Sequence, residues 1–493
     1  MPIQRPGPSS LSNSAAWLYY ESGIASLYLT GRDAWLVTLS RTCRMFAFGA
    51  VSLTIALFFS ELGFSDFRIG LFMSLTLLGD VVLGLVVTLM ADGIGRRRVL
   101  FAGGLLMAIS GAVFCIFENF WILLLAAIVG VVSASGSDFG PFRAIEESML
   151  SHITTPKTRA DVLSWYVTSS SLGSAAGLEL AGRFVEKYKS REGWDLVGTY
   201  HATFWIYIVM GVLNMLLVLG LSSNCEIAKT TSKTPDQSAQ GLLSESGHED
   251  EEVQNVSPQQ PSTSDTKSRF SHISPSTRSV MYKLWFLLIV DSLADGMASQ
   301  ALTTYFLDRK FSLSKATLGD IMSAAMILGT ISTIFAGPLS RHLGLLNTMV
   351  FTHLPSSVAV LLFPAPSGLV LTIILLFIRM GLNNMDQAPR AAFIAAVVKP
   401  DERTAVMGIT STLRTLAMAT GPSFTGALAG SDKFWIAFVV GGILRIMYDL
   451  GLWAMFVNMR LHVHEPDSPD GAVPRLSDED ELEMQRGSSE HQA

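Results

Sequence analysis

The sequence predicts an all-α polytopic membrane protein with about twelve transmembrane helices, arranged as two pseudo-symmetric six-helix bundles. Of its 493 residues, 49% are hydrophobic and only 15% are charged, whereas soluble proteins carry about a quarter charged residues. The hydrophobic residues fall in blocks of roughly twenty, the length with which a helix crosses ~30 Å of hydrocarbon. Short motifs also recur in the two halves of the chain, which indicates a duplication.

The hydrophobic blocks place the expected helices in two sets of six. In the first half we expect helices at 35–61, 69–91, 97–117, 120–143, 161–184 and 200–221. In the second half we expect helices at 283–307, 317–340, 346–364, 368–395, 404–429 and 434–457. These blocks define an N-terminal bundle at 35–221 and a C-terminal bundle at 283–457.

Three polar segments flank the bundles. Residues 1–34 form a polar N-terminal tail without the sustained apolar core of a secretory signal. Residues 222–282 are rich in Ser, Thr, Pro, Gln and acidic residues, which predicts a disordered linker. Residues 458–493 are predicted to form an acidic disordered tail.

Short basic loops predict the orientation, because positive residues remain on the cytoplasmic side. The loops that contain Arg96 to Arg98, Lys157, Arg341 and Lys399 all fall on one side of the predicted topology. We therefore assign both termini and the linker to the cytoplasm. We expect the protein to reside in the plasma membrane, with an internal membrane as the alternative.

The repeat has an offset of roughly 250 residues. Four matches occur in the same order in both halves: Trp35 with Trp285, Ser65 and Gly70 with Ser314 and Gly319, Asp138 with Asp386, and Pro156 with Pro400. This order favours parallel copies related by an axis along the membrane normal.

The loop after the second expected helix reads Asp92-Gly93-Ile94-Gly95 followed by Arg96, Arg97 and Arg98. It resembles the loop signature of the major facilitator superfamily. The resemblance implies two bundles around a central cavity that opens to either side in turn, with this loop latching the halves in one state. The second copy differs, because Arg341 stands where the acid is expected. We assign Asp92, Gly95, Arg96 and Arg97 to this gating loop, with Arg143, Glu146 and Arg390 near it.

Ionisable residues inside the expected helices are candidates for function, because each costs several kcal/mol in lipid. Arg41 and Arg44 share one face of the first helix, and Asp291 and Asp295 share one face of the seventh. We expect a basic wall that faces an acidic wall. The alternative is a set of buried ion pairs that lock the structure.

Other candidates lie in the second, fourth, tenth and twelfth helices. Asp80 is central in the second helix and could carry a proton, or it could pair with Arg44 and be structural. The fourth and tenth helices add Asp138, Arg379, Asn383, Asp386 and Gln387 as candidates for the substrate or proton pathway. In the twelfth helix, Arg445 and Asp449 are four residues apart and are expected to form a structural pair.

These features favour a secondary active transporter, coupled to protons, that moves a small polar or anionic solute. No nucleotide-binding loop is evident, so we expect an ion gradient as the energy source. We expect no enzymatic activity, no cofactor, no metal and no nucleic acid. The expected partners are the lipid bilayer, protons and a small-molecule or ion substrate. We expect the protein to function as a monomer. The alternatives are efflux of xenobiotics or secondary metabolites, and a sensor that does not transport.

Overall fold

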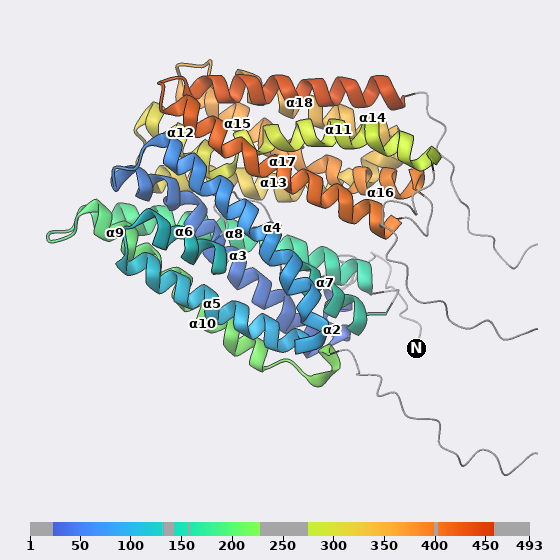
Figure 1. The fold of residues 1–493 in the computed structure, drawn as a ribbon, viewed down its shortest axis with the longest axis horizontal. Coiled ribbons are helices and arrows are strands. Elements are labelled where there is room, and N and C mark those ends of the chain that lie inside the picture. The colour runs from blue at the N-terminus through green and yellow to red at the C-terminus, as the bar shows by residue number, and fades with distance from the viewer. Residues whose placement is uncertain are drawn as a thin grey trace, which may run out of the picture. The chain divides into compact units, whose positions relative to one another are not determined.

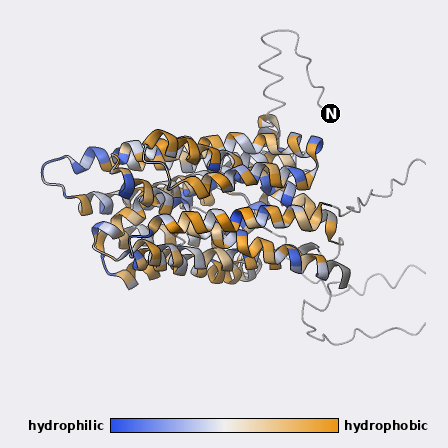
Figure 2. Cartoon of the chain, turned by 90° about the horizontal axis from the view of Figure 1, so that it is seen from above, coloured by the Kyte–Doolittle hydropathy of each residue, from blue (hydrophilic) through white to orange (hydrophobic). Residues whose placement is uncertain are grey.

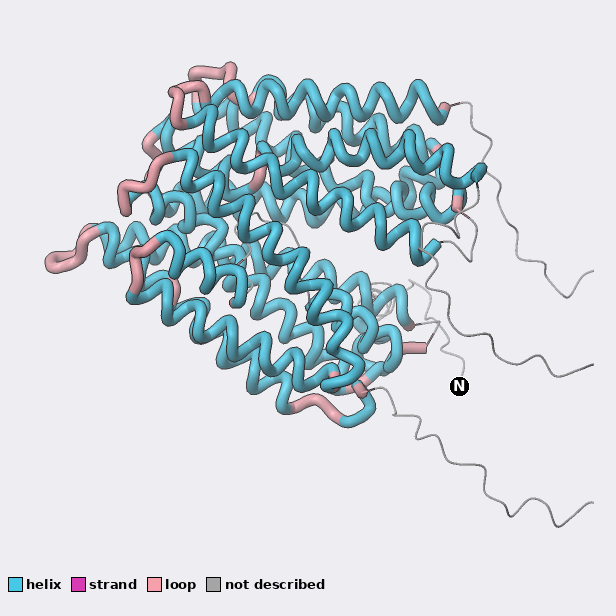
Figure 3. The backbone as a smooth tube through the Cα atoms, in the orientation of Figure 1, coloured by secondary structure: helices cyan, strands magenta, loops and turns pink. Residues whose placement is uncertain are grey.

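A computed structural model describes residues 23–130, 132, 142–155, 158–226, 275–398 and 403–457. In these ranges every regular element is a helix (Figure 3). The first half contains α2 (Ile24–Thr30), α3 (Arg32–Glu61), α4 (Asp66–Ile94), α5 (Arg96–Ile116), α6 (Phe120–Val129), α7 (Phe142–Ile153), α8 (Arg159–Lys189), α9 (Leu196–Thr203), α10 (Trp205–Leu219) and η1 (Ser223–Cys225).

The second half contains α11 (Pro275–Met297), α12 (Gln300–Phe311), α13 (Lys315–Leu343), α14 (Leu345–Leu362), α15 (Leu369–Asn383), η4 (Asn384–Asp386), α16 (Gln387–Val397), α17 (Arg403–Ala429) and α18 (Phe434–Phe456). The helices of each half gather into their own group, blue to green for the first and yellow to red for the second (Figure 1). The chain is therefore an all-α protein with two groups of helices, as predicted.

The helices are built for a hydrocarbon environment. Eight helical segments among the described residues are long and apolar enough to cross a membrane. Hydrophobic residues cover the lengths of the helices, and hydrophilic residues collect in the loops at one end (Figure 2). The predicted fifth and eleventh spans, α8 and α17, are long but more polar, because much of their surface packs against other helices instead of lipid.

Helices α4 and α13 show why the repeated motifs recur. Each is 29 residues long and begins after a serine, Ser65 or Ser314, whose side chain accepts a hydrogen bond from the first turn. Each ends at a glycine with positive φ, Gly95 at 107° or Gly344 at 83°, a backbone conformation that suits residues without Cβ. The serine match of the repeat therefore marks a helix start in both halves.

Among the described residues, the two halves meet mainly along α4 with α17 and α8 with α13, and α3 also packs against α12. Glycines at these crossings allow the backbones to touch. A Cβ on Gly70 would lie 2.2 Å from the carbonyl oxygen of Pro422, and a Cβ on Gly319 would lie 2.9 Å from that of Leu178. Small residues permit this close approach in membrane proteins, and the glycine match of the repeat is explained by it.

Five features differ from the sequence predictions. The predicted fourth span is interrupted, because α6 ends at Val129 and neither Gly130 nor residue 132 is helical. The seventh and tenth spans are also broken, the first at Ala298 and Ser299, and the second at η4. Helix α2 lies within the segment predicted as a polar tail, and α11 begins at Pro275, inside the segment predicted as linker.

Candidate functional site

A buried cluster of charged side chains lies within the second half, and we call it the Asp291 cluster. The Asp291 carboxylate, on α11, is fully buried. Its oxygens lie 3.7 Å from His353 Nε2, 3.7 Å from Arg390, 3.9 Å from Arg414 and 4.0 Å from Arg445. The carboxylate thus lies among partners from α14, α16, α17 and α18.

Hydrogen bonds join α14 to α18 beside Asp291. His353 Nδ1 lies 2.7 Å from Asp449 Oδ1, and the Ser357 hydroxyl donates to Asp449 Oδ2 over 2.7 Å. Arg445 lies 2.8 Å from His353 Nε2, also donates to Asn383 Oδ1, and pairs with Asp295 at 3.3 Å. The expected direct pair of Arg445 with Asp449 is wrong, because His353 lies between them.

The break in the tenth span positions two members of the cluster. Asp386, the last residue of η4, is fully buried and accepts a hydrogen bond from Arg390 on the first turns of α16. Asn383 accepts from Arg445, whereas Gln387 is exposed and donates to Asn384. Asn383 also donates to Asn384 Oδ1 over 3.4 Å, and Gln387 donates to the same oxygen over 3.1 Å, so the two amides lie close together at the 3₁₀ turn.

Arg379 supports the break in the seventh span. Its buried guanidinium donates to the carbonyl oxygen of Ala298 and to Thr303 Oγ1, the latter over 2.8 Å. A broken helix leaves carbonyl oxygens without partners, and such groups are costly in a membrane. Arg379 satisfies one of them, so it holds the helix break beside Asp295 instead of extending the ion pairs of the cluster.

Two members of the cluster are partly exposed. The side chain of Asp295 is 27% exposed and that of Arg414 is 22% exposed, whereas those of Asp291, Arg445 and Asp449 are at most 1% exposed. Arg414 also donates to Ser292 over 3.1 Å. Asp295 and Arg414 are therefore the most exposed charged members of the cluster.

A smaller cluster lies in the first half, around Glu146 of α7. This fully buried carboxylate pairs with Arg44, lies 3.7 Å from Arg41, and accepts a hydrogen bond of 2.7 Å from the Tyr166 hydroxyl. Arg41 also lies over the Tyr166 ring, 4.6 Å from its centroid. We call this the Glu146 cluster, and it joins α3, α7 and α8.

Asp80 is buried in α4. A small pocket of ≈ 10 Å³ is lined by Arg44, Tyr207 and Asn214, among others. Its size is about that of one water molecule.

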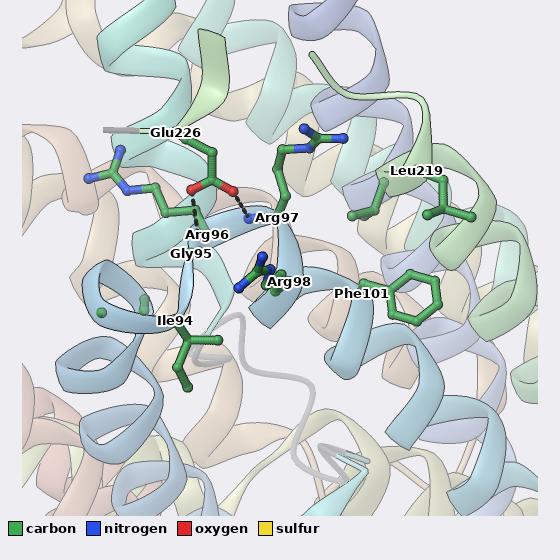
Figure 4. A pocket seen from close by; sticks show the side chains of 11 residues that line it. Ile94, Gly95, Arg96, Arg97, Arg98, Phe101, Leu219 and Glu226 are labelled. Atoms are coloured by element: carbon green, nitrogen blue, oxygen red, sulfur yellow. Dashed lines mark hydrogen bonds between the residues drawn. The ribbon is translucent and has the colours of Figure 1, made fainter. Parts of the chain in front are cut away.

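The loop predicted to act in gating forms a turn, which Glu226 closes from the segment predicted as linker. Gly95 makes the turn, and the Glu226 carboxylate accepts hydrogen bonds from the backbone N–H of Arg96, over 2.9 Å, and of Arg97, over 3.0 Å (Figure 4). Such a carboxylate satisfies free donors at the N-terminus of α5. Together with Arg98, these residues line a pocket of ≈ 620 Å³.

The ion pairs that the described residues form between the two halves lie at the helix ends opposite η1. Arg309 at the end of α12 pairs with Asp66 at the start of α4, over 2.6 Å, and Tyr305 donates to the same carboxylate over 2.7 Å. Arg183 on α8 pairs with Asp320 on α13 over 3.0 Å. We call these contacts the distal ties. They hold the two halves together at one end. Two hydrogen bonds between the halves lie further along the helices: the backbone N–H of Ser423 donates to Ser74 Oγ over 3.0 Å, and Gln300 donates to Ser52 Oγ over 3.2 Å.

The placement of the predicted residues corrects two expectations. Arg41 and Arg44 pair with Glu146, and Asp291 and Asp295 pair with cations of their own half, so these ion pairs do not join a basic wall to an acidic one. Glu146 and Arg390 belong to the buried clusters instead of a gating network, whereas Arg143 pairs with Glu147 at 2.6 Å. Asp138 and the Asp92 side chain lie outside the described residues.

Sequence reasoning missed His353, Tyr166 and the distal ties. His353 left a signal, because a histidine inside an apolar span is itself a candidate for function. No pattern in the sequence predicts the distal ties. Asp66 and Arg309 lie at helix ends, where charged residues are ordinary, and only the fold brings them together.

The comparisons with known proteins agree with this architecture. A family model described as Major Facilitator Superfamily matches residues 37–259 and 284–482. The uncharacterized membrane protein YJR124C of Saccharomyces cerevisiae is 32% identical over 433 residues, which cover 87% of this chain and 95% of the yeast protein.

Two solved structures share the fold. The nucleoside transporter NupG has a TM-score of 0.63 at 14% identity, covering 87% of this chain and 100% of that chain. A D-xylose-proton symporter has a TM-score of 0.64 at 12% identity, covering 86% of this chain and 98% of that chain. At these identities the likeness concerns the fold alone.

Proposed function

The chain belongs to the major facilitator superfamily, and we propose that it is a proton-coupled transporter that moves a small polar or anionic solute by alternating access. Membership makes it a multi-pass membrane protein of a transporter family. The coupling to protons and the class of solute are proposals that go beyond family membership.

The Asp291 cluster is the observation that supports proton coupling and a polar or anionic solute. Four aspartates, four arginines and a histidine lie within one six-helix half, where each charge is costly unless it is paired or reaches water. Asp295, a carboxylate, and Arg414 are both partly exposed, so a solute or a proton could reach them. A guanidinium suits a carboxylate or phosphate group of a solute, and a carboxylate can exchange a proton.

The distal ties also support the proposed alternating-access cycle. We assign the termini and the linker to the cytoplasm, as the basic loops predict. In that orientation the distal ties close the outer end of the protein, so the structure represents the state that faces the cytoplasm. Transport then requires that the Asp66–Arg309 and Arg183–Asp320 pairs separate.

The test is flux in vesicles that contain the purified full-length protein. An imposed pH gradient should drive accumulation of at least one compound from a panel of labelled nucleosides, sugars and small carboxylates. Asp295→Asn and Arg414→Gln should abolish this accumulation, whereas Glu192→Gln, at an exposed loop position, should retain it. Thermal unfolding of each variant shows whether it is folded.

Two results would contradict the proposal. If a compound binds to the wild-type protein but no flux follows under any pH gradient, the protein is a sensor. If folded Asp295→Asn and Arg414→Gln variants both transport normally, the Asp291 cluster is not the solute or proton site.

A further inference from the structure

His353, on α14, has different partners at its two ring nitrogens. Nδ1 lies 2.7 Å from Asp449 Oδ1, and Nε2 lies 2.8 Å from a guanidinium nitrogen of Arg445. A guanidinium can only donate hydrogen bonds, and an ionised carboxylate can only accept them. Nε2 is therefore the acceptor and Nδ1 the donor, which defines a neutral imidazole with its proton on Nδ1.

A proton on Nε2 and the hydrogen bond from Arg445 exclude each other. Asp291 Oδ1 lies 3.7 Å from the same Nε2 and is the acceptor that a protonated ring would turn to. Arg445 would keep two other acceptors, Asn383 and the partly exposed Asp295. Protonation thus moves Arg445 away from the buried ring and toward the accessible edge of the cluster.

The charges around His353 come from every helix of the cluster. They are Asp291 and Asp295 on α11, Arg379 on α15, Asp386 and Arg390 on η4 and α16, Arg414 on α17, and Arg445, Tyr448 and Asp449 on α18. Four arginines and four aspartates sum to zero when His353 and Tyr448 are neutral. One added proton gives a net positive charge, which is costly in a buried site unless an anion offsets it.

We propose that His353 binds the transported proton at Nε2, and that this protonation frees Arg445 to bind the anionic group of the solute. The proton comes from hydronium, so an N–H bond forms, water leaves, and the hydrogen bond from Arg445 breaks. The inference rests on the transport function proposed above. It narrows the solutes to anions that move together with a proton.

Nitrogen-15 NMR of histidine-labelled full-length protein in nanodiscs tests the proton site. His353→Gln identifies the His353 signals, and His201→Gln serves as the matched control, because His201 lies outside the cluster and contacts the Phe114 carbonyl. We expect the Nδ1–H neutral form at about pH 8 and the doubly protonated form at about pH 5. In Arg445→Gln the protonated fraction at one fixed pH should rise several-fold.

Addition of acetate, succinate or inorganic phosphate, each alone, tests the anion site. An anion that binds Arg445 should raise the protonated fraction of His353 in the wild-type protein and leave it unchanged in Arg445→Gln. The proposal is overturned if His353 remains neutral at about pH 5, if Arg445→Gln leaves its protonation unchanged, or if none of the three anions alters it.

Flux separates this inference from the function on which it rests. In the vesicle assay, His353→Gln should lose the dependence of transport on pH, and His201→Gln should keep it. If His353→Gln transports with the wild-type pH dependence, this proposal fails and the transport function stands. If the wild-type protein moves no compound while NMR shows the expected protonation, the transport function fails.

Discussion

In the first half, one carboxylate, Glu146, holds two arginines and a tyrosine, whereas in the second half Asp291 lies among three arginines and a histidine. The signs of the charges on the equivalent helices are opposite, since α3 carries Arg41 and Arg44 and α11 carries Asp291 and Asp295. The serine caps and the glycine contacts of α4 and α13, by contrast, are the same in both halves, and we call these positions the shared frame. The duplication therefore retained the positions that build helices and changed those that carry charge.

The halves also differ in access. Glu146 and Arg41 are buried, and Arg44 is partly exposed, at 18%. In the Asp291 cluster a carboxylate, Asp295, is itself partly exposed, as is Arg414, and the cluster contains the histidine that we propose as the proton site. We interpret the Glu146 cluster as a lock that fixes α7 to α3 and α8, and the Asp291 cluster as the site that works during transport.

The substitution with the largest expected effect tests the Glu146 cluster as a lock. Glu146→Gln removes the carboxylate that pairs with Arg44 and lies 3.7 Å from Arg41, and removing one partner of a buried pair typically costs about 3–5 kcal/mol. Thermal unfolding in detergent should show this loss. Asp295→Asn, in the second half, should cost less, because the Asp295 side chain is partly hydrated. Equal losses for the two variants would remove the distinction between lock and working site.

A second pair of substitutions tests the shared frame at the glycine contacts. Gly70→Ala and Gly319→Ala each place a methyl group against a backbone carbonyl of the other half, and overpacking of this kind typically costs about 1–3 kcal/mol. Gly70→Ala should be the worse of the two, since its Cβ would lie closer to the carbonyl oxygen. The control is Gly337→Ala, at a position where a Cβ meets nothing within 4 Å.

Unfolding temperatures and flux of the three glycine variants provide the measurement. Gly337→Ala should be neutral or slightly stabilising, because alanine favours a helix over glycine. If Gly337→Ala is as harmful as Gly70→Ala, helix propensity and not the contact between halves explains the effect.

The substitutions with the smallest expected effect test the serine caps at the starts of α4 and α13. Ser65→Ala and Ser314→Ala each remove an N-cap, which typically costs about 1 kcal/mol. The loss should be larger for Ser314, whose oxygen lies 3.0 Å from the capped N–H, than for Ser65, at 3.4 Å. Chemical or thermal unfolding of both variants measures the difference, and a reversed order would contradict the cap geometry.

Much of the fold could be predicted from the sequence, because lipid demands long apolar helices and each leaves a block of apolar residues. The all-α class, the two halves and most spans followed from this one constraint. Predictions failed where polar residues compensate locally for a broken helix. Arg379 satisfies a freed carbonyl near Ala298, and the 3₁₀ turn at Asn384–Asp386 interrupts a span that composition alone joins into one helix.

The sequence by itself determined which charged side chains lie inside the expected spans and are costly there: Arg41, Arg44, Asp80, Asp291 and Asp295. Only the tertiary structure decided their partners. Charges act over distances that the chain closes by folding, so Glu146 meets Arg44 from 102 residues away and Asp449 meets His353 from 96. Hydrophobic length is local information and can be read along the chain, whereas charge pairing depends on which helices pack together.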